Sequence, residues 1–68
     1  MISYEPLFNT LNEKGIVISA LREHGVHPTT IASINSNESI KLEKIDKICN
    51  ILAVPIERVV TIILDNQR

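Results

Sequence analysis

The sequence has little cysteine: Cys49 is the only one among 68 residues. A single thiol excludes an intrachain disulfide and a zinc site built from four cysteines. No stretch approaches the length that spans a bilayer, and Glu5 and Pro6 stand where a signal peptide would need a basic and then an apolar run. We therefore expect a cytoplasmic protein in a reducing compartment, with no membrane contact.

The chain also lacks an excess of charge of one sign. Seven basic and eight acidic residues give a net charge of -1. DNA-binding proteins usually present a basic surface that displaces counterions from phosphate. If this chain binds DNA, its positive charges must gather on one face.

Enzymatic chemistry is not expected. A chain of 68 residues has room for one small core and little material for an enclosed active site. We find no nucleophile paired with a base, no phosphate-binding loop and no set of metal ligands. The hydrophobic share of 44% is that of a globular chain. We predict one domain over residues 1–64, a short tail over 65–68, and no cofactor, metal or small-molecule substrate.

The first part of the chain predicts two helices. The first has Ser3 as its N-cap and ends at Lys14 and Gly15, because lysine suits the negative end of the helix dipole and glycine can adopt left-handed backbone. Its predicted buried stripe is Tyr4, Leu7, Phe8 and Leu11. A second, short helix is predicted over 17–23, with three residues able to face inward: Val17, Ala20 and Leu21.

A break at His24, Gly25 and Val26 precedes a third predicted helix. Pro28 suits the first position of this helix, where its missing N–H costs nothing, and His27 precedes it as the capping residue. With two isoleucines as the buried edge, Ile31 and Ile34, helical geometry turns the other side outward. That outward face is small, polar and almost uncharged, and consists of Thr29, Ala32, Ser33 and Ser36.

After a predicted loop over 36–39, the fourth helix has the most regular periodicity in the chain. Its apolar positions are Leu42, Ile45, Ile48, Cys49 and Leu52. A last helix is predicted to begin at Pro55, with Glu57 in its first turn. Its inner stripe would be Ile56, Val59, Val60 and Ile63.

Ile62 and Leu64 are more aliphatic surface than one narrow stripe can bury. They either cover a gap between helices of one subunit or form a two-fold interface. We prefer the interface, in a homodimer paired through the C-terminal helix, because exposed aliphatic residues at a terminal helix are a common means of dimerising and a dimer doubles the binding site of a small protein.

Two short helices joined by a tight turn that contains glycine form a helix-turn-helix, which lets one helix enter a major groove. Three segments resemble the Cro/repressor-type (XRE-like) helix-turn-helix family of small bacterial and phage regulators: Pro28-Thr29-Thr30-Ile31-Ala32, Leu42-Glu43-Lys44-Ile45-Asp46-Lys47-Ile48-Cys49 and Met1-Ile2-Ser3-Tyr4. The likeness covers residue 1 to about residue 63. It implies an all-α, five-helix, lambda-repressor-like DNA-binding bundle whose third helix, about residues 28–35, reads the major groove of DNA.

The resemblance also implies a function and a set of site residues. The implied function is a sequence-specific DNA-binding transcriptional regulator, a repressor, whose partner is double-stranded DNA and which binds as a dimer. The implied base-reading positions are His27, Pro28, Thr29, Ala32 and Ser33. The implied backbone-contacting positions are Ser36, Asn37 and Lys41.

The chain departs from the family in three places. Val17 and Ile18 stand where members often have a capping Thr or Ser followed by Gln or Lys. Ser33 stands where a Lys or Arg is common, and the turn at Gly25 is shorter than the family's. The alternative function is therefore a protein-interaction module on the same fold, antirepressor-like or antitoxin-like, whose third helix presents an ordinary solvent-exposed face.

The lysines at the fourth predicted helix can be interpreted in two ways. Lys41, Lys44 and Lys47 repeat every three residues and could line DNA phosphates. Glu43 and Asp46 alternate with them, so they could equally form a solvated face.

Two further interpretations concern groups that could hold a metal or act as a nucleophile. His24 and His27 are favoured as a turn residue and a helix cap over a pair of metal ligands, because no third ligand is evident. Cys49 is favoured as a small buried hydrophobe over a nucleophile.

Overall fold

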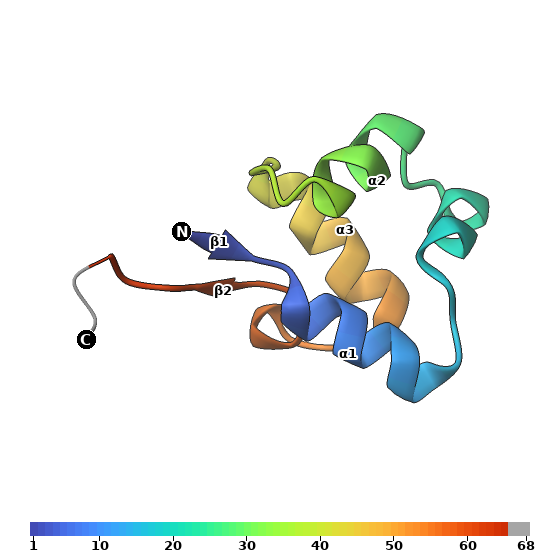
Figure 1. Ribbon diagram of the computed structural model, residues 1–68. Coiled ribbons are helices and arrows are strands. Elements are labelled where there is room, and N and C mark those ends of the chain that lie inside the picture. Colours follow the sequence, from blue (N-terminus) through green and yellow to red (C-terminus); the bar gives the residue numbers. More distant parts are fainter. Residues whose placement is uncertain (66–68) are drawn as a thin grey trace.

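The computed structural model describes residues 1–65; positions 66–68 of the expected tail lie outside the described residues. The described part is mostly helical, with a short ribbon of two strands that leads away from the helices (Figure 1). In chain order, its elements are β1 (Ile2–Ser3), α1 (Glu5–Lys14), η1 (Ile18–His24), α2 (Pro28–Asn35), α3 (Leu42–Leu52), η2 (Ile56–Arg58) and β2 (Thr61–Ile62), where η denotes a 3₁₀-helix.

The expected all-α bundle of five helices is therefore corrected. Over residues 1–65, three segments are α-helices, two are 3₁₀-helices, and the two ends of the chain pair as strands. The antiparallel register aligns Ile2 with Ile62 and Ser3 with Thr61. This pairing joins residues some sixty positions apart, so no local periodicity announces it.

Helix α1 begins one residue later than an N-cap at Ser3 predicts, because the observed N-cap is Tyr4, and it ends where expected. Ser3 lies in β1, and its hydroxyl accepts a hydrogen bond of 3.3 Å from the backbone of Glu5. Gly15 ends the helix with φ of 67°, in the left-handed region that glycine tolerates. Phe8, predicted to be buried, is 40% exposed, and Thr10 is buried in its stead because its hydroxyl donates to the Arg58 carbonyl at 2.7 Å.

The second helix is confirmed as a short helical segment but is 3₁₀. Leu21 is fully buried and Ala20 half-buried, whereas Val17, expected to face inward, is 68% exposed. The reason is its backbone: Val17 precedes the helix in an extended conformation, with φ of -86° and ψ of 149°, which turns its side chain away from the helical stripe.

Helix α3 confirms the most regular pattern of the sequence. Ile45, Ile48 and Leu52 are buried, and Cys49 is half-buried at the edge of the stripe. Leu42, predicted to be buried, is 74% exposed because it is the first residue of the helix and lies beyond the elements that cover the rest.

The predicted last helix is wrong beyond one turn. After η2, the chain becomes extended, and Thr61–Ile62 pairs with β1. Of the expected inner stripe, Val59 is fully buried, while Ile56 and Ile63 are exposed. The run from Val59 to Ile63 consists only of β-branched residues, which favour strands over helices, and β1 supplies the partner.

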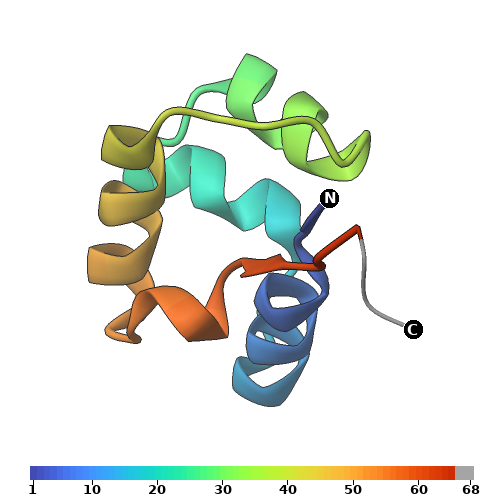
Figure 2. The ribbon, with the colours of Figure 1, turned by 90° about the vertical axis from the view of Figure 1, so that its left-hand side faces the viewer.

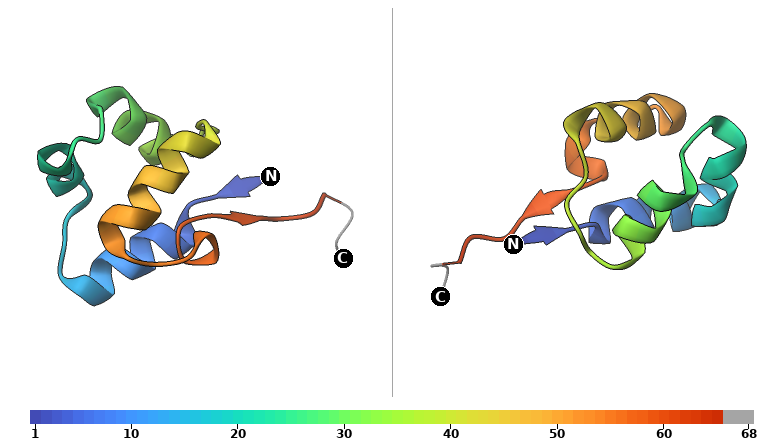
Figure 3. Two further views of the ribbon diagram at one scale, coloured as in Figure 1. Left: turned by 180° about the vertical axis from the view of Figure 1, so that it is seen from behind. Right: turned by 90° about the horizontal axis from the view of Figure 1, so that it is seen from above.

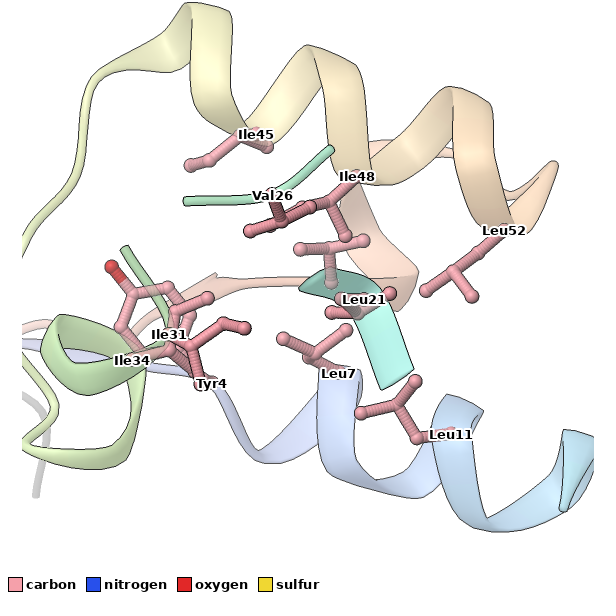
Figure 4. Close-up of a cluster of buried hydrophobic side chains, with 11 residues drawn as sticks. Tyr4, Leu7, Leu11, Leu21, Val26, Ile31, Ile34, Ile45, Ile48 and Leu52 are labelled. Carbon is pink, nitrogen blue, oxygen red and sulfur yellow. The ribbon is translucent and has the colours of Figure 1, made fainter. Parts of the chain in front are cut away.

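One apolar core joins the elements (Figure 4). Helices α1, α2 and α3 and the segment around η1 each direct aliphatic side chains into it. Its buried members are Tyr4, Leu7, Leu11, Leu21, Val26, Ile31, Ile34, Ile45, Ile48, Leu52 and Val59. This core fixes α2 through one side only, and α2 lies on the outer side of the bundle in views a quarter turn apart (Figures 1 and 2).

Candidate nucleic-acid interface

Helix α2 begins at the cap that the sequence predicted. His27 has extended backbone, and its Nδ1 accepts a hydrogen bond of 3.1 Å from the backbone N–H of Thr29. The same nitrogen lies 2.7 Å from the Thr29 hydroxyl oxygen. Pro28 opens the helix, so one of the N–H groups that would otherwise be unpaired is absent.

The two faces of α2 differ as expected. Ile31 and Ile34 are buried, together with Thr30, and hold the helix against the core. Thr29, Ala32 and Ser36 are exposed and Ser33 is half-buried. No residue of α2 carries a formal charge, so the outward face presents methyl groups, hydroxyls and the free dipole of the helix N-terminus.

A groove of about 400 Å³ runs between this face and the start of α3. Of the predicted site residues, it brings together Thr29, Ser33 and Lys41. Four further residues line the groove without having been predicted as site residues, although Lys44 was one of the three lysines that could line phosphates: Thr30, Ser39, Ile40 and Lys44. We call this feature the α2–α3 groove.

The α2–α3 groove is lined by two cations and by no carboxylate. Lys41 precedes α3 and Lys44 follows one turn later, so the spacing of three residues brings both ammonium groups to the same edge. Glu43 is exposed in the same turn but does not line the groove. The charge balance of the whole chain thus conceals a local positive edge beside the uncharged face of α2.

Lys47 has a different task from the other two lysines. Its ammonium donates a hydrogen bond of 2.8 Å to the carbonyl of Gly25, in the turn between η1 and α2. Gly25 has φ of 95°, which an L side chain adopts only with strain. Lys47 therefore connects α3 to the turn. The three lysines do not act alike: Lys41 and Lys44 line the groove, whereas Lys47 is hydrogen-bonded to the turn.

Asn37 also makes a bond that the sequence analysis missed. Its backbone is left-handed, with φ of 58°, and its side-chain Nδ2 donates to the carbonyl of Ile2 in β1 at 2.7 Å. One residue later, the hydroxyl of buried Tyr4 donates to the carbonyl of Glu38 at 2.6 Å. The loop after α2 is thus bonded to the start of the chain. The predicted phosphate contact of Asn37 would have to share this amide.

Cys49 and the histidines add no second site. The Cys49 thiol is half-buried, and burial together with the nearby Asp46 carboxylate raises its pKa, which leaves it protonated and unreactive at neutral pH. Within residues 1–65, no three His, Cys, Asp or Glu side chains come close enough to hold a metal ion. None of the helices described is long and apolar enough to cross a bilayer.

No protein-family model matches this chain, and no curated protein does. Among solved structures, it is similar to the crystal structure of the transcriptional regulator VanUg, form II, with 28% sequence identity and a TM-score of 0.83. The similarity covers 88% of this chain and 81% of that one. The chain therefore shares, over nearly all of its length, the fold of a transcriptional regulator.

Proposed function

We propose that this chain is a transcriptional regulator, a repressor of the cytoplasm, that binds double-stranded DNA sequence-specifically by inserting α2 into the major groove. The observation that carries the proposal is the α2–α3 groove, which joins an uncharged, small-residue helix face to two lysines without a carboxylate among its lining residues. The similarity to a transcriptional regulator supports the same conclusion.

The uncharged face suits the reading of bases. Small side chains let the backbone of α2 approach the base edges closely, hydroxyls of Thr29 and Ser33 can donate or accept hydrogen bonds, and the methyl groups of Thr29 and Ala32 suit the thymine methyl. His27 and Pro28 lie at the N-terminus of α2, where the positive end of the helix dipole favours a phosphate group.

The rim of the α2–α3 groove suits the DNA backbone. Lys41 and Lys44 are exposed, and each can neutralise one phosphate. Ser36 is exposed at the end of α2, within the loop that leads to them. Two copies paired through the segment with Ile62 and Leu64 would double this contact set on a two-fold symmetric operator.

Base reading is tested with the double variant Thr29→Ala, Ser33→Ala. We expect discrimination between operator and random DNA to fall by about 1–3 kcal/mol for each lost base contact. Thermal stability should change little, because neither side chain supports the core and the contact of the Thr29 hydroxyl with His27 lies at the surface. Binding is measured by titration of a selected operator and of random duplex. Unchanged discrimination would reject α2 as the reader.

Phosphate contact is tested by the salt dependence of binding. Lys41→Gln and Lys44→Gln are each expected to reduce the slope of log K against log salt by about 0.9, the value for one lost phosphate contact. Lys14→Gln is the matched control, because Lys14 is an exposed lysine at the far end of α1 and outside the groove. The same reduction in all three variants would argue against a localised backbone contact.

The alternative, a protein-interaction module, is favoured by a second groove. It measures about 330 Å³, lies between α3 and η2, and is lined by Leu42, Ile45, Asp46, Cys49 and Ile56. Leu42 and Ile56 are exposed there. Binding of a protein to this apolar groove should hardly respond to salt, whereas DNA binding should weaken steeply.

A further inference from the structure

The ribbon of β1 and β2 has two outer edges, and the structure treats them differently. The backbone N and O of Met1 exchange hydrogen bonds with those of Ile63, at 2.7 and 2.8 Å. In an antiparallel ladder, the next pair, Ile2 with Ile62, therefore directs its N–H and C=O groups outward, away from the ribbon. Each outer edge thus has one central residue that needs partners from elsewhere.

The outer edge of β1 is covered by the chain itself. The outward carbonyl of Ile2 accepts the hydrogen bond from Asn37 Nδ2, in the loop after α2. The adjacent bond from Tyr4 to Glu38 holds the same loop beside the strand. No further strand can pair at this edge without displacing that loop.

The outer edge of β2 is open. Within residues 1–65, the N–H and C=O of Ile62 and the N–H of Leu64 have no hydrogen-bond partner, although both residues lie in or beside a strand. Ile62 is 60% exposed and Leu64 57%. The ribbon also extends away from the helices, so no other element of the described residues shields this edge (Figures 1 and 3).

The sequence of this edge lacks the residues that usually keep an exposed strand from pairing. From Val60 to Leu64 it carries no charge and no proline, the two devices that usually protect a free edge from association. Three alternate residues, Val60, Ile62 and Leu64, lie on one face of the strand, and Thr61 and Ile63 lie on the other. A partner strand must therefore be equally apolar and extended.

We propose that the partner is β2 of a second copy of this chain, and that the two edges pair antiparallel about a two-fold axis at Ile62. In this register, each Ile62 exchanges both backbone hydrogen bonds with its equivalent, and each Leu64 N–H donates to the Val60 carbonyl of the other copy. On one face of the joined strands, the two Ile62 side chains are neighbours, and each Val60 lies opposite a Leu64.

The proposed pairing produces one sheet in the order β1-β2-β2-β1. Its two-fold axis is perpendicular to the sheet. Equivalent parts of the two copies therefore lie on the same side of the sheet and at the same distance from it. The inference takes from the proposed function only its homodimer, and replaces the expected pairing through a C-terminal helix by pairing through a strand edge. It is tested without DNA, so that a failure of pairing and a failure of DNA binding are distinguishable.

The first test is the association state of the full chain by sedimentation velocity over a range of concentrations. We expect a dimer for the natural sequence and for Leu42→Lys, and a rise in dimer Kd of about tenfold or more for Ile62→Lys, which places a charge in the edge. Leu42→Lys is the matched control because it adds the same charge to the apolar groove between α3 and η2. A monomer at all concentrations, or loss of the dimer in Leu42→Lys but not in Ile62→Lys, would overturn the proposal.

Ile62→Pro separates the backbone contact from the side chain. It removes the outward N–H but none of the bonds between β1 and β2, which use Met1, Ser3, Thr61 and Ile63, and proline is tolerated where a strand's N–H faces outward. We expect the same weakening as for Ile62→Lys, with a far-ultraviolet circular dichroism spectrum like that of the natural sequence. A dimer of undiminished affinity in this folded variant would contradict edge pairing.

The register of the proposed pairing is tested by disulfide formation between engineered cysteines. Cys49 is first replaced by serine, so that the introduced cysteine is the only thiol. In the proposed pair, the two Cα atoms of position 62 lie about 5.5 Å apart, within the range of a disulfide, whereas those of position 61 are offset. We expect Ile62→Cys to yield a covalent dimer on mild oxidation and Thr61→Cys to yield far less. Equal yields would refute the two-fold axis at Ile62.

Discussion

The two ends of α2 are held by different parts of the molecule and by bonds of different burial. At the first end, Nδ1 of His27 accepts from Thr29, and Lys47 of α3 donates to the carbonyl of Gly25, all at the surface. At the second end, the hydroxyl of Tyr4, a residue only 2% exposed, donates to the carbonyl of Glu38.

This difference matters for the use of α2. Hydrogen bonds at the surface are exchanged with water at small cost, whereas the Tyr4–Glu38 bond is partly buried, and water replaces a lost partner there less easily. The end near Tyr4 is therefore the firmer of the two. The end at His27 and Pro28, which would meet DNA first, can adjust more easily to a ligand.

The largest effect is expected from Tyr4→Phe, which deletes the donor of the partly buried hydrogen bond and keeps the buried ring. The free energy of unfolding should fall by about 2 kcal/mol, measured by urea denaturation at neutral pH. An effect equal to that of Lys47→Met would show that the two ends are held with similar strength and would break the comparison.

Tyr4 also makes a pH-dependent contribution. Burial raises the pKa of its phenol above the usual 10.0. Folding therefore favours the protonated form, so this contribution is complete below pH 10 and is lost as the pH rises through the raised pKa. The stability difference between the natural sequence and Tyr4→Phe should thus shrink above pH 10, and a constant difference would contradict the assigned donor.

A smaller effect is expected at Asn37, where backbone strain and hydrogen bonding can be separated. Asn37→Ala loses the bond to Ile2 and places a residue poorly suited to φ of 58° in the left-handed region, so we expect a loss of about 1–1.5 kcal/mol. Asn37→Gly loses only the bond and should cost about 0.5 kcal/mol, since glycine adopts this conformation freely. Equal losses would show that the bond alone holds the loop.

The smallest effect is expected from Lys47→Met, which removes the surface bond to Gly25 while keeping much of the aliphatic stem. The free energy of unfolding should fall by about 0.5 kcal/mol. The slope of log K against log salt for DNA should stay unchanged, in contrast to Lys44→Gln, because Lys47 serves the turn and not a phosphate. A reduced slope for Lys47→Met would show that this lysine contacts a phosphate after all.

Much of the candidate site followed from local chemistry. The cap at His27, the proline after it and the alternation of isoleucines with small residues predicted α2 and its outward face, and the structure confirms both. These features act within a few residues, so they need no knowledge of the rest of the chain. The bonds of Asn37 and Lys47 could not be predicted, because each reaches an element distant in sequence.

The C-terminal segment shows the opposite case. Ile56, Val59, Val60 and Ile63 have the spacing of a helical stripe, yet the same run is rich in β-branched residues, and short apolar runs of this kind fit either structure. The sequence by itself determined that the segment is apolar, that α1, α2 and α3 are helices, and where two glycines end helical turns. Only the tertiary structure decided that residues 61–62 form a strand, because the partner, β1, lies some sixty residues away in the sequence and stands beside them only in the folded chain.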